Sequence, residues 1–341
     1  MAEEKNIKRK NYVNLTGYLK ENTLKVVKSS SGVEAISGSL IIATSETDAH
    51  KVQFYANKVF KSGKENSLYK ELDALMPSKT ISIASYVKQN PTSNYATAAQ
   101  CSTKVYVGGS LEEYATKLDG KERSIITIRG SRARIKTVTD AHPFVPSATF
   151  NVDMYIESMR EESKWNKDRE DMELTGRHII VGLIPDYLGC MNKIEFVVPK
   201  DRADFVKSNY ANTDTANFTG EILNTETKIV KKTVSDDPFA WNNSKESQYE
   251  TEFIRERRIM GRDNGSLPIH QGEEGSITIE EVKNGLVLRD EKILKNTQNR
   301  GNKNNTSSFG TRNVKSVENE FGFTDSAQSV GSVSDFNLDD F

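Results

Sequence analysis

Short runs of β-branched and aromatic residues, separated by turn residues, dominate the first 139 positions of the chain. This pattern predicts strands at Asn11–Leu19, Thr23–Lys28, Val33–Ala43, Lys51–Lys61, Thr80–Val87, Lys104–Val107 and Ser124–Val138. The stretch Asn66–Leu75 differs, because its apolar residues recur at the spacing of one helical face. The predicted order is therefore several strands, one helix and further strands.

A second β-rich unit follows Pro143 and Pro146, which mark the junction. Strands are predicted at Ala148–Met159, Met172–Leu183, Lys193–Pro199 and Asn217–Leu223, with a short helix at Arg202–Tyr210. A five-stranded barrel with a helix between its third and fourth strands is the OB-fold plan. We therefore predict a mainly β protein with two OB-like five-stranded barrels, at residues 11–139 and 140–234.

The remaining segments lack a strong strand pattern. Residues 1–10 are polar and are predicted to form a flexible arm. Residues 235–295 are an uncertain module or wrapping segment, in which Phe253–Met260 has a helical pattern. Ser276–Arg289 has the alternation of a hairpin with Lys283-Asn284-Gly285 as its turn. Residues 296–341 are rich in Asn, Ser and Gly and cannot bury enough apolar surface to offset chain entropy. We expect a disordered linker there, ending in an acidic tip.

Composition narrows the classes of protein further. No apolar run approaches the roughly 18 residues of a membrane span, and the first residues lack the layout of a signal peptide. The chain has only two cysteines, Cys101 and Cys190, which is too few for a disulfide framework. Two cysteines and four histidines also argue against a structural zinc site. These features indicate a soluble cytoplasmic protein with no membrane partner.

The formal net charge of −1 conceals an asymmetry. Residues 315–341 carry one base and six acids, a net of −5, which leaves +4 on the other 314 residues. A basic body with an acidic tail is typical of nucleic-acid binding combined with an interaction tail. Acidic tails that only promote solubility give the same pattern.

No catalytic constellation is visible in the sequence. It contains no phosphate-binding glycine loop, G-x-S-x-G elbow, HExxH or CxxC motif, and its histidines are scattered singly. We therefore expect no enzymatic activity, no cofactor and no metal.

Two groups of residues have a pattern typical of single-strand binding. In an extended segment Phe54, Lys58 and Phe60 share a face, on which bases would stack and the lysine would meet phosphate. The alternative is that both phenylalanines belong to the core.

The second group comprises Arg129, Arg132, Arg134 and Lys136, of which the last three alternate with apolar residues along one strand. Like charges on one strand face repel unless an anion covers them. The alternative is a solvated edge strand that charge protects from aggregation.

The C-terminal tip interleaves acids with apolar side chains. Its candidate partner-binding residues are Asp335, Phe336, Leu338, Asp339, Asp340 and Phe341. A terminal Phe offers a ring and a carboxylate to a pocket with a basic rim.

The layout resembles that of bacterial and phage single-stranded DNA-binding proteins, which have an OB domain, a low-complexity linker and an acidic tip ending in Phe. Asn14–Leu19 is similar to their opening strand, and Phe54–Phe60 to the strand that carries stacking aromatics. Residues 107–136 resemble the closing hairpin. The chain departs from the family in having Asp340 where Pro usually precedes the last Phe, and in residues 140–295, which the short members lack. Tyr155, Trp165 and Phe196 are only candidates for stacking in the second unit.

The resemblance implies a sequence-nonspecific single-stranded DNA-binding protein, acting in phage DNA replication or recombination within the host cytoplasm. It implies that the tip recruits replication and repair proteins, and it leaves a homo-oligomer open. The main alternative is a virion structural or assembly protein built of β domains. A nucleic-acid enzyme is a third interpretation. The sequence shows no cluster of carboxylates at the spacing needed to bind a metal ion, and this argues against it.

Overall fold

The computed structural model describes residues 9–29, 32–60, 62–137, 139, 143–166, 170–231 and 248–305. The strands are β1 (Asn11–Asn22), β2 (Lys25–Lys28), β3 (Glu34–Ala43), β4 (Ala49–Asn57), β5 (Lys104–Leu118), β6 (Lys121–Ile135), β7 (Ser147–Asn166), β8 (Asp171–Pro185), β9 (Met191–Val198), β10 (Thr215–Lys231) and β11 (Gln248–Gly261). The helices are α1 (Ser67–Ala74), α2 (Ile83–Gln89), α3 (Tyr95–Cys101), α4 (Lys200–Asn209) and α5 (Ile279–Asn305), with a 3₁₀ turn η1 (Asp263–Gly265).

The first barrel is closed by β1, β3, β4, β6 and β5. Its pairs are antiparallel, except that β4 and β6 run parallel. Helix α1 follows β4, the third strand of this barrel, and precedes β5, the fourth. This is the OB plan that the sequence predicts. The inward-facing residues of the strands, such as Leu15, Leu40 and Val52, are fully buried.

The second barrel repeats this topology with β7, β8, β9, β11 and β10. Strands β9 and β11 are parallel, the other pairs are antiparallel, and α4 lies between β9 and β10. The prediction of a mainly β protein with two five-stranded barrels is therefore confirmed. The closing strand of the second barrel, β11, comes from residues 235–295. The sequence pattern had indicated a helix at Phe253–Met260, and that prediction is wrong because this segment pairs along β10.

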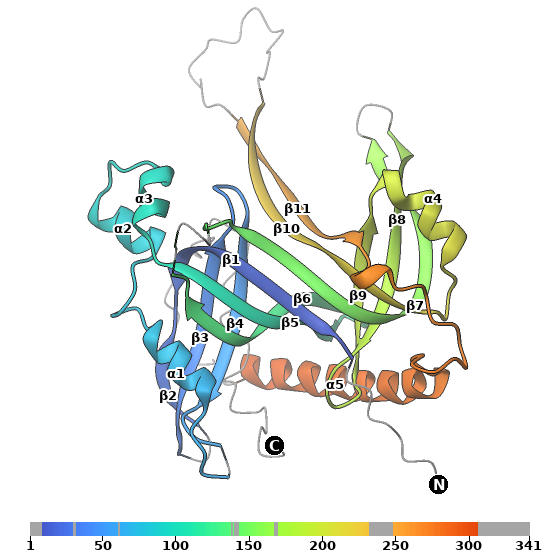
Figure 1. The fold of residues 1–341 in the computed structure, drawn as a ribbon, viewed down its shortest axis with the longest axis horizontal. Helices are drawn as coiled ribbons and strands as arrows, with labels where there is room; N and C mark the ends of the chain where they lie inside the picture. Colours follow the sequence, from blue (N-terminus) through green and yellow to red (C-terminus); the bar gives the residue numbers. More distant parts are fainter. Residues whose placement is uncertain are drawn as a thin grey trace, which may run out of the picture.

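Antiparallel pairing of β1 with β7 joins the two barrels into one continuous sheet, visible across the centre of Figure 1. A second joint lies between the β3–β4 turn and β10. There Asp48 bridges Thr225, and the backbone N–H of Asn224 donates to the Asp48 carboxylate at 2.8 Å. Burial raises the pKa of Asp48, but hydrogen bonds from His50, Thr44 and Asn224 outweigh it, so this pKa lies below its ordinary value.

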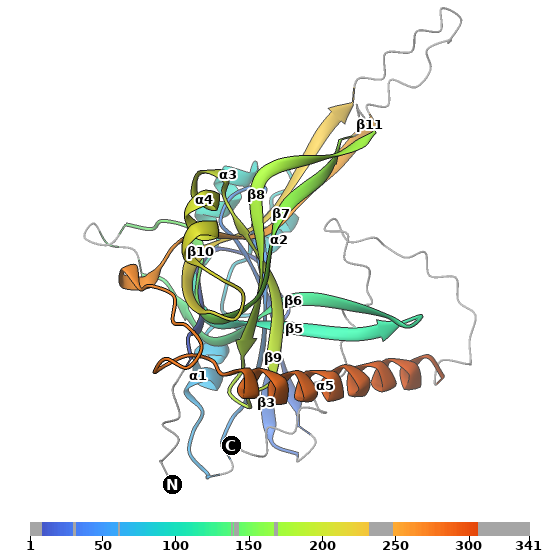
Figure 2. The same ribbon diagram turned by 90° about the vertical axis from the view of Figure 1, so that its right-hand side faces the viewer.

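Helix α5 runs beneath both barrels in Figure 1 and beside the β5–β6 hairpin in Figure 2. The hairpin predicted at Ser276–Arg289 is therefore wrong. Thr278 and Glu281 form a capping box, in which each side chain accepts a hydrogen bond from the other residue's backbone N–H. The predicted turn glycine, Gly285, lies within the helix, where a Cβ would collide with the backbone of Gly189.

The predicted strand Thr80–Val87 is also wrong, since most of it forms α2. Ser82 caps this helix and exchanges hydrogen bonds with Ser85, the serine version of the capping box. In the part of the chain that the structure describes, no helix combines the length and the apolar character needed to cross a bilayer.

Candidate nucleic-acid interface

The predicted basic residues of β6 lie together on the outside of the first barrel. Gly130 and Ala133 are buried, whereas Arg132 and Arg134 are exposed. The register shifts by one residue, because Gly108 faces Arg132 while Gly109 faces Gly130. Ser131 is thus the extra residue of a β-bulge, and the bulge keeps Arg129 on the same outer face as the later arginines. We call Arg123, Arg129, Arg132, Arg134 and Lys136 the β6 basic face.

Aromatic side chains lie beside this face, on β5 and in the segment before β7. Tyr106 of β5 is directly across from Arg134, and its hydroxyl donates to Asn14 of β1 at 2.7 Å. The Lys104 ammonium lies 5.4 Å from the centre of the Phe144 ring. The strand pattern alone does not single out Tyr106, although its alternation with Val105 and Val107 places it on the outer face.

Carboxylates neutralise part of the β6 basic face. Arg134 Nε lies 2.8 Å from Glu71 of α1, and Arg129 lies 3.6 Å from Glu112. Apart from these pairs, Arg123, Arg132 and Lys136 have no ion pair with any residue that the structure describes. These three cations are therefore the best placed to meet a phosphate.

Phe54 requires a correction, because the structure places it inside the barrel and not on a stacking face. It is 3% exposed, and a Cβ at Gly130 of β6 would collide with its ring. Val52, which shares the Phe54 face, is fully buried. The alternation along β4 was correct about which residues share a face, but that face is the core.

Lys58 and Phe60 lie beyond the end of β4, in its connection to α1. The Lys58 ammonium pairs with Glu34 at 3.0 Å and lies 6.0 Å from the centre of the Tyr69 ring. Phe60 is 46% exposed. The described contacts do not connect either residue with the β6 basic face, and their part in binding nucleic acid stays a prediction.

The outer face of β6 continues along the β5–β6 hairpin beyond the barrel. Arg123 and Ile125 are exposed there, and Ile125 pairs with Tyr114 of β5. Tyr187, from the β8–β9 turn of the other barrel, is also exposed and lies close to Arg129. Burial raises the pKa of the Tyr187 hydroxyl, while the positive charge of Arg129 opposes that shift. Nothing in the sequence links Tyr187 to β6, because only the folded topology brings the two together.

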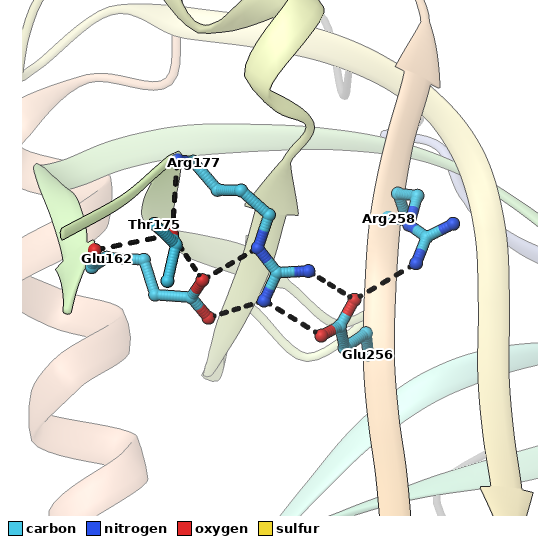
Figure 3. Close-up of polar contacts among 5 residues, drawn as sticks. All are labelled: Glu162, Thr175, Arg177, Glu256 and Arg258. Atoms are coloured by element: carbon cyan, nitrogen blue, oxygen red, sulfur yellow. Dashed lines mark hydrogen bonds and ion pairs between the residues drawn. The ribbon is translucent and has the colours of Figure 1, made fainter. Parts of the chain in front are cut away.

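In the second barrel, β11 has the position that β6 has in the first, but its arginines bind within the protein. Figure 3 shows the Arg177 guanidinium between the carboxylates of Glu162 and Glu256, with distances of 2.6 and 3.0 Å. Glu256 also pairs with Arg258 of β11 at 3.4 Å, and Arg257 donates to the Glu195 carbonyl at 2.8 Å.

The Arg177 cluster fastens the β7–β8 hairpin to the β10–β11 hairpin. The hydrogen bonds that the Arg177 guanidinium donates to Glu162 and Glu256 raise its pKa above the ordinary value. Among the aromatic residues considered for stacking in this barrel, Tyr155 and Phe196 are buried in the core, while Trp165 is 57% exposed near the end of β7.

The predicted tip residues, from Asp335 to Phe341, lie outside the described residues. Within the described ranges, no three side chains of His, Cys, Asp or Glu come together in a way that could hold a metal ion.

Comparison with known proteins gives one matching family and several solved structures of low sequence identity. The family model described as YorF matches residues 10–299. No curated protein matches the chain significantly. A deletion variant of the single-stranded DNA binding protein from Thermus aquaticus is 10% identical, with a TM-score of 0.42 over 79% of this chain and 99% of its own. The wild-type protein is 11% identical, with a TM-score of 0.37 over 75% of this chain and 96% of its own.

Proposed function

This chain belongs to the YorF family, and we propose that it binds single-stranded DNA without reading its sequence and has no catalytic activity. The observation that carries the proposal is the β6 basic face, with Tyr106 beside it on the outside of a closed barrel. Lysine and arginine follow a phosphate backbone, while an aromatic ring accepts any base by stacking. The described side chains offer a surface for an extended polyanion, and this surface requires no metal.

Cations should dominate the binding, because three of the five on the β6 basic face have no ion pair with a described residue and the other contacts are aromatic rings. The affinity should therefore fall as salt rises, with a slope of about −0.7 per phosphate neutralised on a single strand. A duplex should bind more weakly, because its bases are stacked on one another and cannot stack on Tyr106.

The experiment is a titration of fluorescently labelled oligo-dT with the full chain at several salt concentrations, alongside a duplex of equal length. Salt-dependent binding that prefers the single strand supports the proposal. Binding that is absent, or equal for both nucleic acids, contradicts it and favours a structural role for the two barrels.

The role in replication or recombination rests on the acidic tip. Its charge of opposite sign to the body and its apolar side chains suit a basic pocket on a partner protein. Deleting residues 335–341 should leave the affinity for oligo-dT unchanged or higher, because no cation is lost. A marked loss of affinity on deletion would contradict a tip that serves partners.

A further inference from the structure

The β5–β6 hairpin extends past the strand that supports it. Strand β1 pairs with β5 only from Lys104 to Gly109, so the later residues of β5 have an unpaired edge. Unpaired backbone groups at a sheet edge need other partners or invite association. Of the β6 basic face, Arg123 lies on this extended part of the hairpin, opposite Thr116.

Side chains from elsewhere in the fold occupy the first part of that edge. Asn11 of β1 accepts from the Leu111 N–H at 2.9 Å and donates to the Leu111 carbonyl at 3.0 Å. Asn192 of β9 accepts from the Glu113 N–H at 2.9 Å. Residues of both barrels, Asn11 and Asn192, therefore hold the hairpin at the point where it extends beyond the first barrel.

Helix α5 occupies the next part of the same edge. Asn296 donates to the Ala115 carbonyl at 3.1 Å, and Thr297 accepts from the Lys117 N–H at 2.9 Å. The helix and the hairpin lie side by side in Figure 2. The α5 side chains therefore act as a substitute for a neighbouring strand.

A buried ion cluster fastens the same two elements. Arg289 of α5 donates two hydrogen bonds of 2.7 Å to Glu113 of β5, and the two side chains are only 9% and 3% exposed. Arg289 also pairs with Glu122 of β6. Glu113 accepts in addition from the backbone N–H of Lys193 in β9. One guanidinium thus joins the helix to both strands of the hairpin and, through Glu113, to the second barrel.

We propose that α5 holds the β5–β6 hairpin in a fixed position, a role that we call the splint, and that Arg289 is its positioning residue. Held in this way, the hairpin extends the DNA-binding surface beyond the barrel. The inference rests on the proposed function. A short single strand occupies the barrel part of the β6 basic face, and a longer one also needs the hairpin. The helix touches the hairpin edge and the face opposite to Arg123 and Ile125, which leaves the outer face open.

The test compares oligo-dT of about 5 and about 15 nucleotides, within the range of site sizes of single OB folds. The double variant Arg289→Met/Glu113→Gln removes both buried charges together, so that neither is left unpaired. A second variant, Asn296→Ala/Thr297→Val, removes the edge hydrogen bonds and leaves the ion cluster intact. The matched control is Arg160→Met/Glu195→Gln, which removes an exposed ion pair of 2.6 Å from the second barrel.

Both splint variants should bind the longer oligonucleotide about tenfold more weakly, a loss of the size that contact with one base contributes, because the nucleotides beyond the barrel lose a fixed surface. Their affinity for the shorter one, and the control's affinity for both, should stay unchanged. Equal losses at both lengths would show that the variants only damage the fold, and no loss at either length would show that the hairpin is not part of the surface. Both results would overturn the proposal.

Hydrogen exchange separates this proposal from the proposed function. The amides of residues 113–126 should exchange faster in both splint variants than in the wild type and the control. If the wild type binds no oligo-dT, the proposed function fails, and faster exchange would still establish the splint. Unchanged exchange in both splint variants would overturn the splint itself.

Discussion

Strands β6 and β11 close their barrels in the same topological position, and both are rich in arginine, yet they use it differently. On β6, Arg132 is exposed and has no ion pair with a described residue. Around β11, Arg258 pairs with Glu256, while Arg177 lies between Glu256 and Glu162 (Figure 3). The comparison teaches that nearby carboxylates decide what a basic strand does. Where the topology brings carboxylates to its arginines, the arginines stabilise the fold; where it does not, they remain available to bind a ligand.

The largest expected effect concerns the ion-pair cluster of Arg177 in the second barrel. Replacing Arg177 by Met leaves the Glu162 carboxylate, 13% exposed, without its cation, and leaves the Glu256 carboxylate, 12% exposed, with only its longer pair to Arg258. Breaking a buried pair in this way costs about 3 kcal/mol of unfolding free energy. Urea unfolding measures this loss.

The exposed pair of Arg160 with Glu195 provides the control for that experiment. Its side chains are 52% and 55% exposed, so Arg160→Met should cost less than about 1 kcal/mol. Folded Arg177→Met protein should keep its full affinity for oligo-dT. A loss of DNA affinity without a loss of stability would reverse the roles that we assign to the two barrels.

The next effect concerns stacking on the first barrel. Tyr106→Ala should weaken oligo-dT binding by about 1–3 kcal/mol, because a base loses its ring partner. Tyr106→Phe keeps the ring and loses only the hydrogen bond to Asn14, so its affinity should stay close to that of the wild type. Fluorescence titration of both variants measures the difference, and equal affinities for Ala and Phe would exclude stacking at this position.

A smaller effect concerns the joint between the barrels. Because hydrogen bonds hold the pKa of Asp48 below its ordinary value of 3.8, its carboxylate stabilises the fold above that pH. This contribution is lost as the pH falls through the lowered pKa of the folded state. Urea unfolding at about pH 6 and about pH 3 should show a larger difference between wild type and Asp48→Asn at the higher pH. Parallel profiles of the two proteins would contradict a stabilising Asp48.

Period-two alternation was sufficient to predict the fold class and the shared outer face of Arg132 and Arg134. It could not tell which face of a strand meets the core, and Phe54 was therefore assigned to the wrong side. Val52 on the same face was the available signal, because a strand in a small barrel turns its apolar side inward.

Other features depend on contacts between distant segments. The capping box of Thr278 and Glu281 was readable in the sequence, but the Asn-Gly pair after it favoured a turn. By contrast, the closeness of Tyr187 to Arg129 arises only when the two barrels pack together, and the ion pairs of Arg289 with β5 and β6 arise only when α5 packs on the hairpin. No local pattern contains that information.

The most direct test of the account is the salt dependence of oligo-dT binding in two matched double variants. Arg132→Ala/Lys136→Ala removes two cations from the β6 basic face, and Lys164→Ala/Arg255→Ala removes two from the hairpins of the second barrel. At about 0.7 per phosphate contact, the first variant should flatten the slope of log affinity against log salt by about 1.4, and the second should leave it unchanged. Equal slopes in the two variants would contradict the assignment of DNA binding to the first barrel.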